Sequence, residues 1–178
     1  SDILLFDREL GPTSQLILRN GKLKGKYRYG IHLKGTLDFT NAPDNYASFV
    51  TIENITAFCD SDAPDENTFV FLDTACKRIN ISKCGAETIN GLISNGKTVE
   101  TFIDSCMFFA TGTNGYALKV FSIYENTNKN GTKWIYAEGF HITNSEIDAS
   151  KNKKAFYISD VFAAIVSNCY IGCGLIIA

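Results

Sequence analysis

A four-residue phrase recurs six times along this chain of 178 residues. Each copy has an aliphatic residue, a polar residue, a turn-tolerant residue and then a small or apolar residue. The copies are Leu18–Gly21, Ile52–Ile55, Ile81–Cys84, Ile103–Cys106, Ile142–Ser145 and Val166–Cys169. Their third residues stand at 20, 54, 83, 105, 144 and 168, so successive copies are 34, 29, 22, 39 and 24 residues apart. A repeat of roughly 20–50 residues indicates stacked units. The uneven steps favour stacked strands joined by unequal loops over helical repeats of one length.

The residues around each phrase alternate between apolar and other side chains, as at Leu16 and Leu18 or Ile79 and Ile81. A period of two predicts a β-strand with one face turned inward. The third residue is Asn in four copies, and Asn tolerates the left-handed backbone conformation, so it predicts a sharp bend between two strands. Stacked Asn side chains would also hydrogen-bond to one another. Strand, bend, strand and a longer loop together predict one turn of a parallel β-helix.

A β-sandwich of antiparallel strands is the competing fold. It explains the alternation and the Gly and Asn turns, but it does not explain one phrase with the same strand-bend-strand structure in each copy. We therefore predict an all-β fold, a single-stranded solenoid of about six or more turns with irregular loops. We expect one domain over residues 1–178 that forms a segment of a longer chain.

The composition argues against several classes of partner. A net charge of −2 gives no support for a nucleic-acid partner, and no apolar run approaches the roughly 18 residues of a membrane helix. The six cysteines include no CxxC pair and no nearby His, so we predict neither a metal site nor a cofactor. Cys84, Cys106 and Cys169 share the fourth position of the phrase, which predicts a column of small buried groups that behave as modest hydrophobes, with mostly free thiols.

Two stretches, Gly139–Ile147 and Ala164–Ile171, resemble the turns of pectate-lyase-like right-handed β-helices. In its aromatic content, interior cysteines and few prolines, the chain is most similar to bacteriophage tailspikes. The resemblance covers residues 14–175 and implies a right-handed parallel β-helix in a trimeric protein. It also implies a bacterial polysaccharide as partner and a virion or other extracellular location. The family contains lyases, hydrolases and glycan-binding spikes, and no catalytic motif of the family can be matched residue by residue here.

Two rows of stacked positions carry carboxylates. Stacked strands lie about 4.8 Å apart, so equivalent positions of successive turns form a row. The row before the bend places Glu53 and Asp104 two turns apart, at about 9–10 Å, near the upper end of the spacing in inverting glycosidases. The row after the bend places Glu87 and Asp148 at a similar spacing with Phe109 between them. Such pairs suit sugar hydrolysis, in which one acid stays protonated and the other charged. Outward carboxylates that only keep the surface soluble are the alternative.

Aromatic and histidine side chains are the candidates for sugar binding. His141 is predicted to face outward on the side of Asp104, as a base or as a hydrogen-bond donor to sugar. Four aromatic residues surround the excursion at 111–133, where exposed rings would stack on sugars and buried rings would anchor the loop. The predicted substrate-binding residues are Phe109, His141, Tyr116, Tyr124, Trp134 and Tyr136.

The sequence thus predicts the β-helix part of a phage tailspike-like homotrimer that recognises a bacterial surface polysaccharide. If the protein also cleaves this polysaccharide, we expect glycosidic hydrolysis by one of the two carboxylate pairs. One alternative is a stand-alone microbial polysaccharide lyase or glycoside hydrolase; for a lyase, the cations Lys22, Lys24, Lys26 and Arg28 would neutralise uronic acids. Another is a non-enzymatic structural or adhesive β-helix. Release of reducing ends indicates hydrolysis, absorbance from unsaturated uronates indicates a lyase, and glycan retention without either indicates a binding module.

Overall fold

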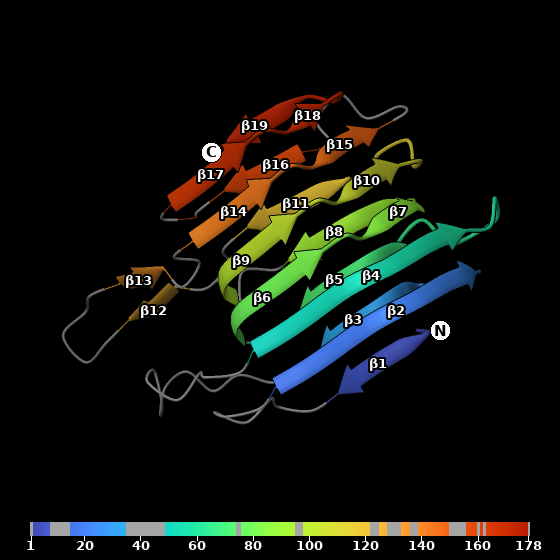
Figure 1. Cartoon of the computed structure of the whole chain (residues 1–178), viewed down its shortest axis with the longest axis horizontal. Helices are drawn as coiled ribbons and strands as arrows, with labels where there is room; N and C mark the ends of the chain where they lie inside the picture. Colours follow the sequence, from blue (N-terminus) through green and yellow to red (C-terminus); the bar gives the residue numbers. More distant parts are fainter. Residues whose placement is uncertain are drawn as a thin grey trace.

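The computed structural model describes residues 2–7, 15–34, 49–73, 76–94, 98–121, 125–127, 133–135, 139–149, 156–159, 161 and 163–177. Within these ranges the protein is all-β, and its mostly parallel strands form curled sheets that are compatible with a β-helix or solenoid (Figure 1). The stack begins with the N-terminal strand at the bottom of the view and ends with the C-terminal strands at the top. The described part of the chain has no helix long and apolar enough to cross a membrane.

Two parallel sheets contain nearly all of the strands. The order of the seven-stranded sheet is β1 (Leu4–Asp7), β3 (Tyr29–Lys34), β5 (Thr68–Asp73), β8 (Asn90–Ser94), β11 (Leu118–Phe121), β16 (Phe156–Ser159) and β19 (Leu175–Ile177). The larger sheet has two arms, and β2 (Gln15–Gly25) and β4 (Phe49–Cys59) run through both. Its pre-bend arm continues with β6 (Cys76–Ser82), β9 (Thr98–Asp104), β14 (Gly139–Thr143) and β17 (Ala163–Ser167). Its post-bend arm continues with β7 (Gly85–Thr88), β10 (Met107–Ala110), β15 (Glu146–Ala149) and β18 (Tyr170–Ile171).

Each copy of the phrase builds one repeat of this stack, numbered 1 to 6 along the chain. The first residues of the phrases are register partners throughout, so that Ile52 pairs with Ile81 and Ile81 with Ile103. A short antiparallel pair, β12 (Glu125–Thr127) with β13 (Lys133–Ile135), follows repeat 4 and projects from the side of the stack (Figure 1). The predicted in-register stacking of the six phrases is therefore confirmed.

The predicted bends are confirmed at all six copies. The non-glycine residues with positive φ in the described ranges are the six third positions, with φ between 51° and 58°: Asn20, Asn54, Lys83, Ser105, Asn144 and Asn168. The predicted Asn ladder forms at both ends of the stack, where Asn54 donates to Asn20 at 2.8 Å and Asn168 to Asn144 at 2.6 Å. Lys83 and Ser105 interrupt it in the middle.

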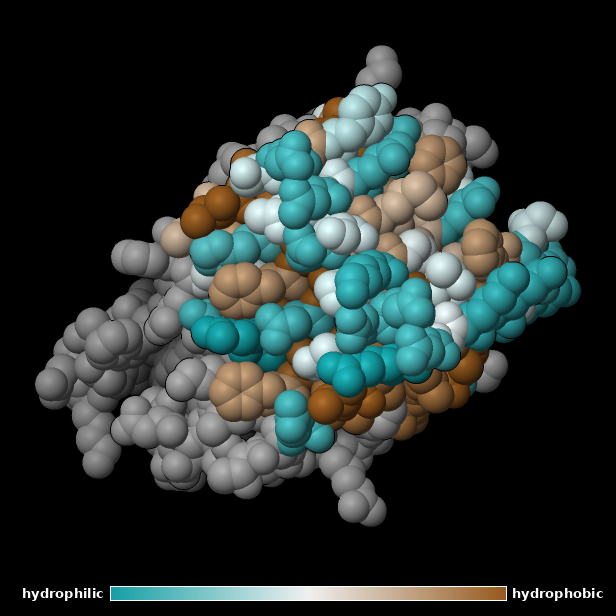
Figure 2. Space-filling model, in the orientation of Figure 1, coloured by the Kyte–Doolittle hydropathy of each residue, from teal (hydrophilic) through white to brown (hydrophobic). Residues whose placement is uncertain are grey.

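The interior lies between the two sheets and is filled by aliphatic and aromatic side chains. Phe69, Phe108, Phe140 and Phe156 are fully buried. They pack in pairs, with ring centroids 6.1 Å apart for Phe69 and Phe108 and 6.4 Å apart for Phe140 and Phe156. Hydrophilic and hydrophobic side chains are interspersed on the outer face shown in Figure 2. The repeats therefore share one apolar core and differ in what they present outside.

Candidate functional site

The row of carboxylates before the bend has the predicted register. Glu53 pairs with Ser82, and Ser82 pairs with Asp104. The two carboxylates thus stand two strand spacings apart, at about 9–10 Å. This confirms their placement in one row and leaves their catalytic role a prediction.

Both carboxylates of this row are engaged by neighbouring repeats. Glu53 lies 2.9 Å from the Arg19 Nε atom and 3.4 Å from the Lys83 Nζ atom. Asp104 accepts hydrogen bonds from the hydroxyl of Thr143 at 2.7 Å, the amide of Asn144 at 2.8 Å and the hydroxyl of Ser105 at 2.9 Å. These donors, Thr143 first, lower the pKa of Asp104, because they stabilise its charged form. The geometry therefore favours a structural use of both groups over a protonated catalytic acid.

The hydrogen bonds of Asp104 predict a loss of stability in acid. A pKa below the unfolded value of about 3.9 means that Asp104 stabilises the fold above that pH. The contribution disappears as the pH falls through the lowered folded pKa. The variant Asp104→Asn should be less stable than the parent at neutral pH, and the difference should shrink as the pH falls through the lowered folded pKa of Asp104. Urea unfolding of both proteins across this range measures it. A difference that is constant with pH would contradict the prediction.

The row after the bend also has the predicted register, with Phe109 between Glu87 and Asp148. Glu87 is exposed, whereas Phe109 and Asp148 are half-buried. The Asp148 Oδ1 atom accepts the backbone N–H of Ala149 at 2.7 Å. The carboxyl of Asp148 also occupies the space beside Gly172, where an added Cβ would lie 2.6 Å from the Asp148 Cγ atom. The structure thus assembles this pair around an aromatic ring, and its catalytic role stays a prediction.

The predicted substrate-binding residues that can be placed lie on or beside different strands of the stack. His141 is half-buried on the pre-bend arm, where its ring stacks on Phe102 with centroids 4.6 Å apart. Tyr116 lies just before β11 and packs edge-on against Tyr157 at 6.4 Å. Tyr124 and Tyr136 lie outside the described residues, and only the backbone of Trp134, in β13, is described. Tyr116 is thus the member of the predicted aromatic cluster whose side chain is described, and the cluster itself stays a prediction.

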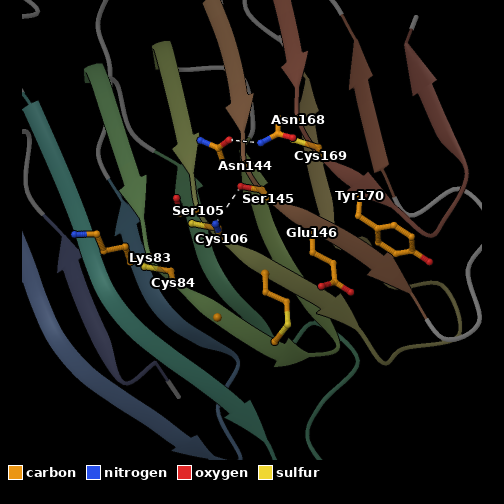
Figure 3. Close-up of a pocket in the computed structure, with 12 residues that line it drawn as sticks. Lys83, Cys84, Ser105, Cys106, Asn144, Ser145, Glu146, Asn168, Cys169 and Tyr170 are labelled. Atoms are coloured by element: carbon orange, nitrogen blue, oxygen red, sulfur yellow. Dashed lines mark hydrogen bonds between the residues drawn. The ribbon is translucent and has the colours of Figure 1, made fainter.

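A groove of about 880 Å³ follows the bends of repeats 3 to 6 (Figure 3). It is lined by three consecutive residues of each repeat, the bend residue and the two that follow: Lys83–Gly85, Ser105–Met107, Asn144–Glu146 and Asn168–Tyr170. Met107 is 49% exposed and Tyr170 61% exposed, and the carboxylate of Glu146 lies between them in the same row. The groove is shallow and open to solvent, and it combines apolar surface with amide, hydroxyl and charged groups.

The sequence interpretation missed the groove because it followed the wrong positions of the phrase. It considered the polar residue directly before the bend and the residue four places after the bend, because these two rows contain the predicted carboxylates. The rim of the groove is formed by the residue two places after each bend: Gly85, Met107, Glu146 and Tyr170. This row is outward-facing by alternation and could have been aligned, but its hollow shape depends on the angle between the two arms.

The floor of the groove is a column of thiols and one hydroxyl at the fourth position. Cys84 and Cys106 are each 3% exposed and Ser145 is 4% exposed, which confirms the predicted inward column in repeats 3 to 5. Cys169, in the last repeat, is only half-buried. The side chains are more than small hydrophobes, however. Cys84 donates to the Ser82 carbonyl at 3.2 Å, and Ser145 to the Thr143 carbonyl at 2.7 Å. The predicted free thiols are confirmed for the five described cysteines, Cys59, Cys84, Cys106, Cys169 and Cys173.

Removing the hydroxyl of the column should destabilise the fold. Ser145 Oγ accepts the backbone N–H of Cys106 at 3.0 Å, so Ser145→Ala leaves that N–H buried without this partner. We expect a loss of about 1–3 kcal/mol of unfolding free energy. Ser145→Cys, which the column already accommodates in other repeats, should lose less. Chemical denaturation of the three proteins measures their free energies of unfolding. Equal values for the parent and the alanine variant would contradict the prediction.

No metal centre is formed by the described side chains, among which no group of three or more His, Cys, Asp or Glu could hold an ion. Comparison with known proteins found no matching family model, no matching curated protein and no matching solved structure. The function must therefore be argued from the groove and the carboxylate rows alone.

Proposed function

We propose that this chain is the right-handed parallel β-helix part of a tailspike-like virion protein that recognises a bacterial surface polysaccharide. The observation that carries the proposal is the groove along the bends. It runs along the stack through four repeats and alternates apolar and polar groups at its rim. A long, open groove of this kind suits a linear polymer better than a compact small molecule.

The chemistry of the groove fits a glycan chain. The step between repeats is about 4.8 Å, close to the length of one sugar unit, so successive units would meet successive repeats. The exposed Tyr170 ring and the Met107 thioether offer apolar surface for the flat faces of sugar rings. Glu146, Asn144 and Asn168 offer partners for hydroxyl groups. The groove therefore supplies both stacking and hydrogen bonding along one line.

Hydrolysis is proposed as a second activity of the same face, carried by Glu87 and Asp148. They flank Phe109 in the row next to the groove rim, and neither has an ion pair among the described residues. Glu53 and Asp104 are the weaker pair because their oxygens already bind neighbouring repeats. A lyase has less support, since Lys26 pairs with Asp62 and Arg28 lies over the Tyr29 ring at 5.0 Å.

Glycan binding is the test of the recognition proposal. Purified protein is titrated with a panel of bacterial surface polysaccharides, and binding is followed by calorimetry. Tyr170→Ala should weaken binding about tenfold, since an aromatic contact contributes about 0.5–1.5 kcal/mol. Ile165→Ala is the matched control, because Ile165 is similarly exposed but belongs to the pre-bend arm. Equal effects of the two variants, or no binding to any glycan, would refute the proposed site.

Cleavage and assembly are tested separately. Released reducing ends would support hydrolysis, and they should fall at least about a hundredfold in Glu87→Gln and Asp148→Asn while binding persists. Reducing ends that persist in both variants would exclude this pair. The molar mass in solution tests the proposed homotrimer, and a monomeric mass would oppose it.

A further inference from the structure

Two thiols lie next to each other on the floor of the groove. Cys84 and Cys106 occupy the fourth position of repeats 3 and 4, and the next residues, Gly85 and Met107, are register partners. In-register neighbours lie about 4.8 Å apart between Cα atoms, within the range of about 4.4–6.8 Å that a disulfide spans. Both line the groove (Figure 3). Among the described cysteines no other two are adjacent in a column, since Ser145 separates Cys106 from Cys169.

The two thiols make equivalent hydrogen bonds, since each donates to the carbonyl two residues earlier, at 3.2 Å for Cys84 and 3.3 Å for Cys106, but their pKa values shift in opposite directions. The thiol of Cys106 is the main cause that lowers the pKa of Cys84, and the backbone N–H groups of Ile55 and Asn54 in repeat 2 lower it further. The pKa of Cys106 is raised by the hydrogen bond with Cys84 and by burial. A backbone donor also reaches the next member of the column, because the Cys106 N–H donates to Ser145 Oγ at 3.0 Å. Backbone donors contact both sulfurs, and the lowered pKa of Cys84 favours the thiolate on that member of the pair.

We propose that Cys84 and Cys106 form an oxidisable dithiol at the floor of the groove, with Cys84 as the nucleophile and Cys106 as the resolving thiol. The Cys84 thiolate attacks one oxygen of a peroxide such as hydrogen peroxide. The O–O bond breaks, Cys84 becomes a sulfenic acid and the other oxygen leaves as water after taking a proton. The Cys106 sulfur then attacks the Cys84 sulfur, releases a second water and closes the disulfide. Two thiols are oxidised and one peroxide is reduced.

The experiment treats the folded protein with hydrogen peroxide and follows the cysteines by thiol titration and peptide mapping. We expect the loss of two thiols per chain and a cross-linked pair of peptides containing Cys84 and Cys106. Cys106→Ser should stop the reaction at a sulfenic acid on Cys84, which a dimedone probe traps. Serine suits this position because Ser145 already makes the same backbone hydrogen bonds in repeat 5.

Cys169 provides the control within the chain. It has the same position in repeat 6 and is half-buried, hence more accessible than Cys84, but it has no neighbouring thiol. Reaction governed by exposure alone would oxidise Cys169 first, and that order would overturn the proposal. So would a Cys84 that reacts only after the protein is unfolded in urea. Cys169→Ser should leave both the rate and the cross-link unchanged.

Discussion

Replacing Phe108 by alanine should lower the free energy of unfolding by about 3–5 kcal/mol, the cost of emptying an aromatic site in a packed interior. Phe108 is fully buried in β10 and packs against Phe69 of repeat 2. The cavity would open between the two sheets, where the backbone of three adjoining strands is held by ladder hydrogen bonds and cannot close over it. Because each repeat is supported by its neighbours, the damage should extend beyond repeat 4.

The next residue of the same strand is the control for this prediction. Phe109 faces outward and is half-buried, so Phe109→Ala should cost only about 1 kcal/mol. Urea denaturation of the parent and both variants, followed by intrinsic fluorescence and circular dichroism, gives the two losses. Equal losses would mean that the assignment of inward and outward faces in β10 is wrong.

Replacing Gly91 by alanine should be comparably harmful, for the opposite reason. A Cβ atom at this position of β8 would lie 2.3 Å from the Ala117 carbonyl oxygen and 3.1 Å from the Phe108 Cβ atom. The first of these is backbone, so no side-chain rotation relieves the clash. Overpacking of this kind costs up to about 3 kcal/mol, and we expect the variant to lie at that limit.

Gly85→Ala is the matched substitution in the same repeat. Its added Cβ would meet only the Thr56 Cγ2 atom, at 3.8 Å. Since alanine restricts the unfolded chain more than glycine does, this variant should gain about 0.4–1 kcal/mol. The thermal and urea unfolding midpoints should therefore fall for Gly91→Ala and rise for Gly85→Ala. A change in the same direction for both variants would contradict the described packing.

The phrase predicted those features of the fold that depend on local backbone geometry. Alternation predicts which side chains face inward, and Asn predicts the left-handed bends, so the register of β2, β4, β6, β9, β14 and β17 could be anticipated. Even Lys83 and Ser105 adopt the bend conformation, because their neighbours in the stack impose it. The inward column was also predictable, but the hydrogen bond between repeats from the Cys106 N–H to Ser145 Oγ was not, because it depends on the exact approach of successive repeats.

The predicted site was less accessible to sequence reasoning. The carboxylate rows follow from alternation, but the engagement of Asp104 by Thr143 and Asn144 depends on side-chain rotamers. The groove depends on how the two arms meet. His32 illustrates the limit, since its Nδ1 atom lies 2.8 Å from an Asp2 carboxylate oxygen that no repeat spacing relates to it. Loops and the ends of the stack follow no period, so the contacts that they make cannot be aligned.

The six bends also determine how the length of such a chain can change. A residue inserted into either arm would reverse the inward and outward faces of every position between it and the next bend. Loops between repeats have no such constraint, and repeats here are separated by 22 to 39 residues on the same core. Segments of new sequence can therefore be grafted between repeats to alter the outer surface, while the strands and their bends keep their register.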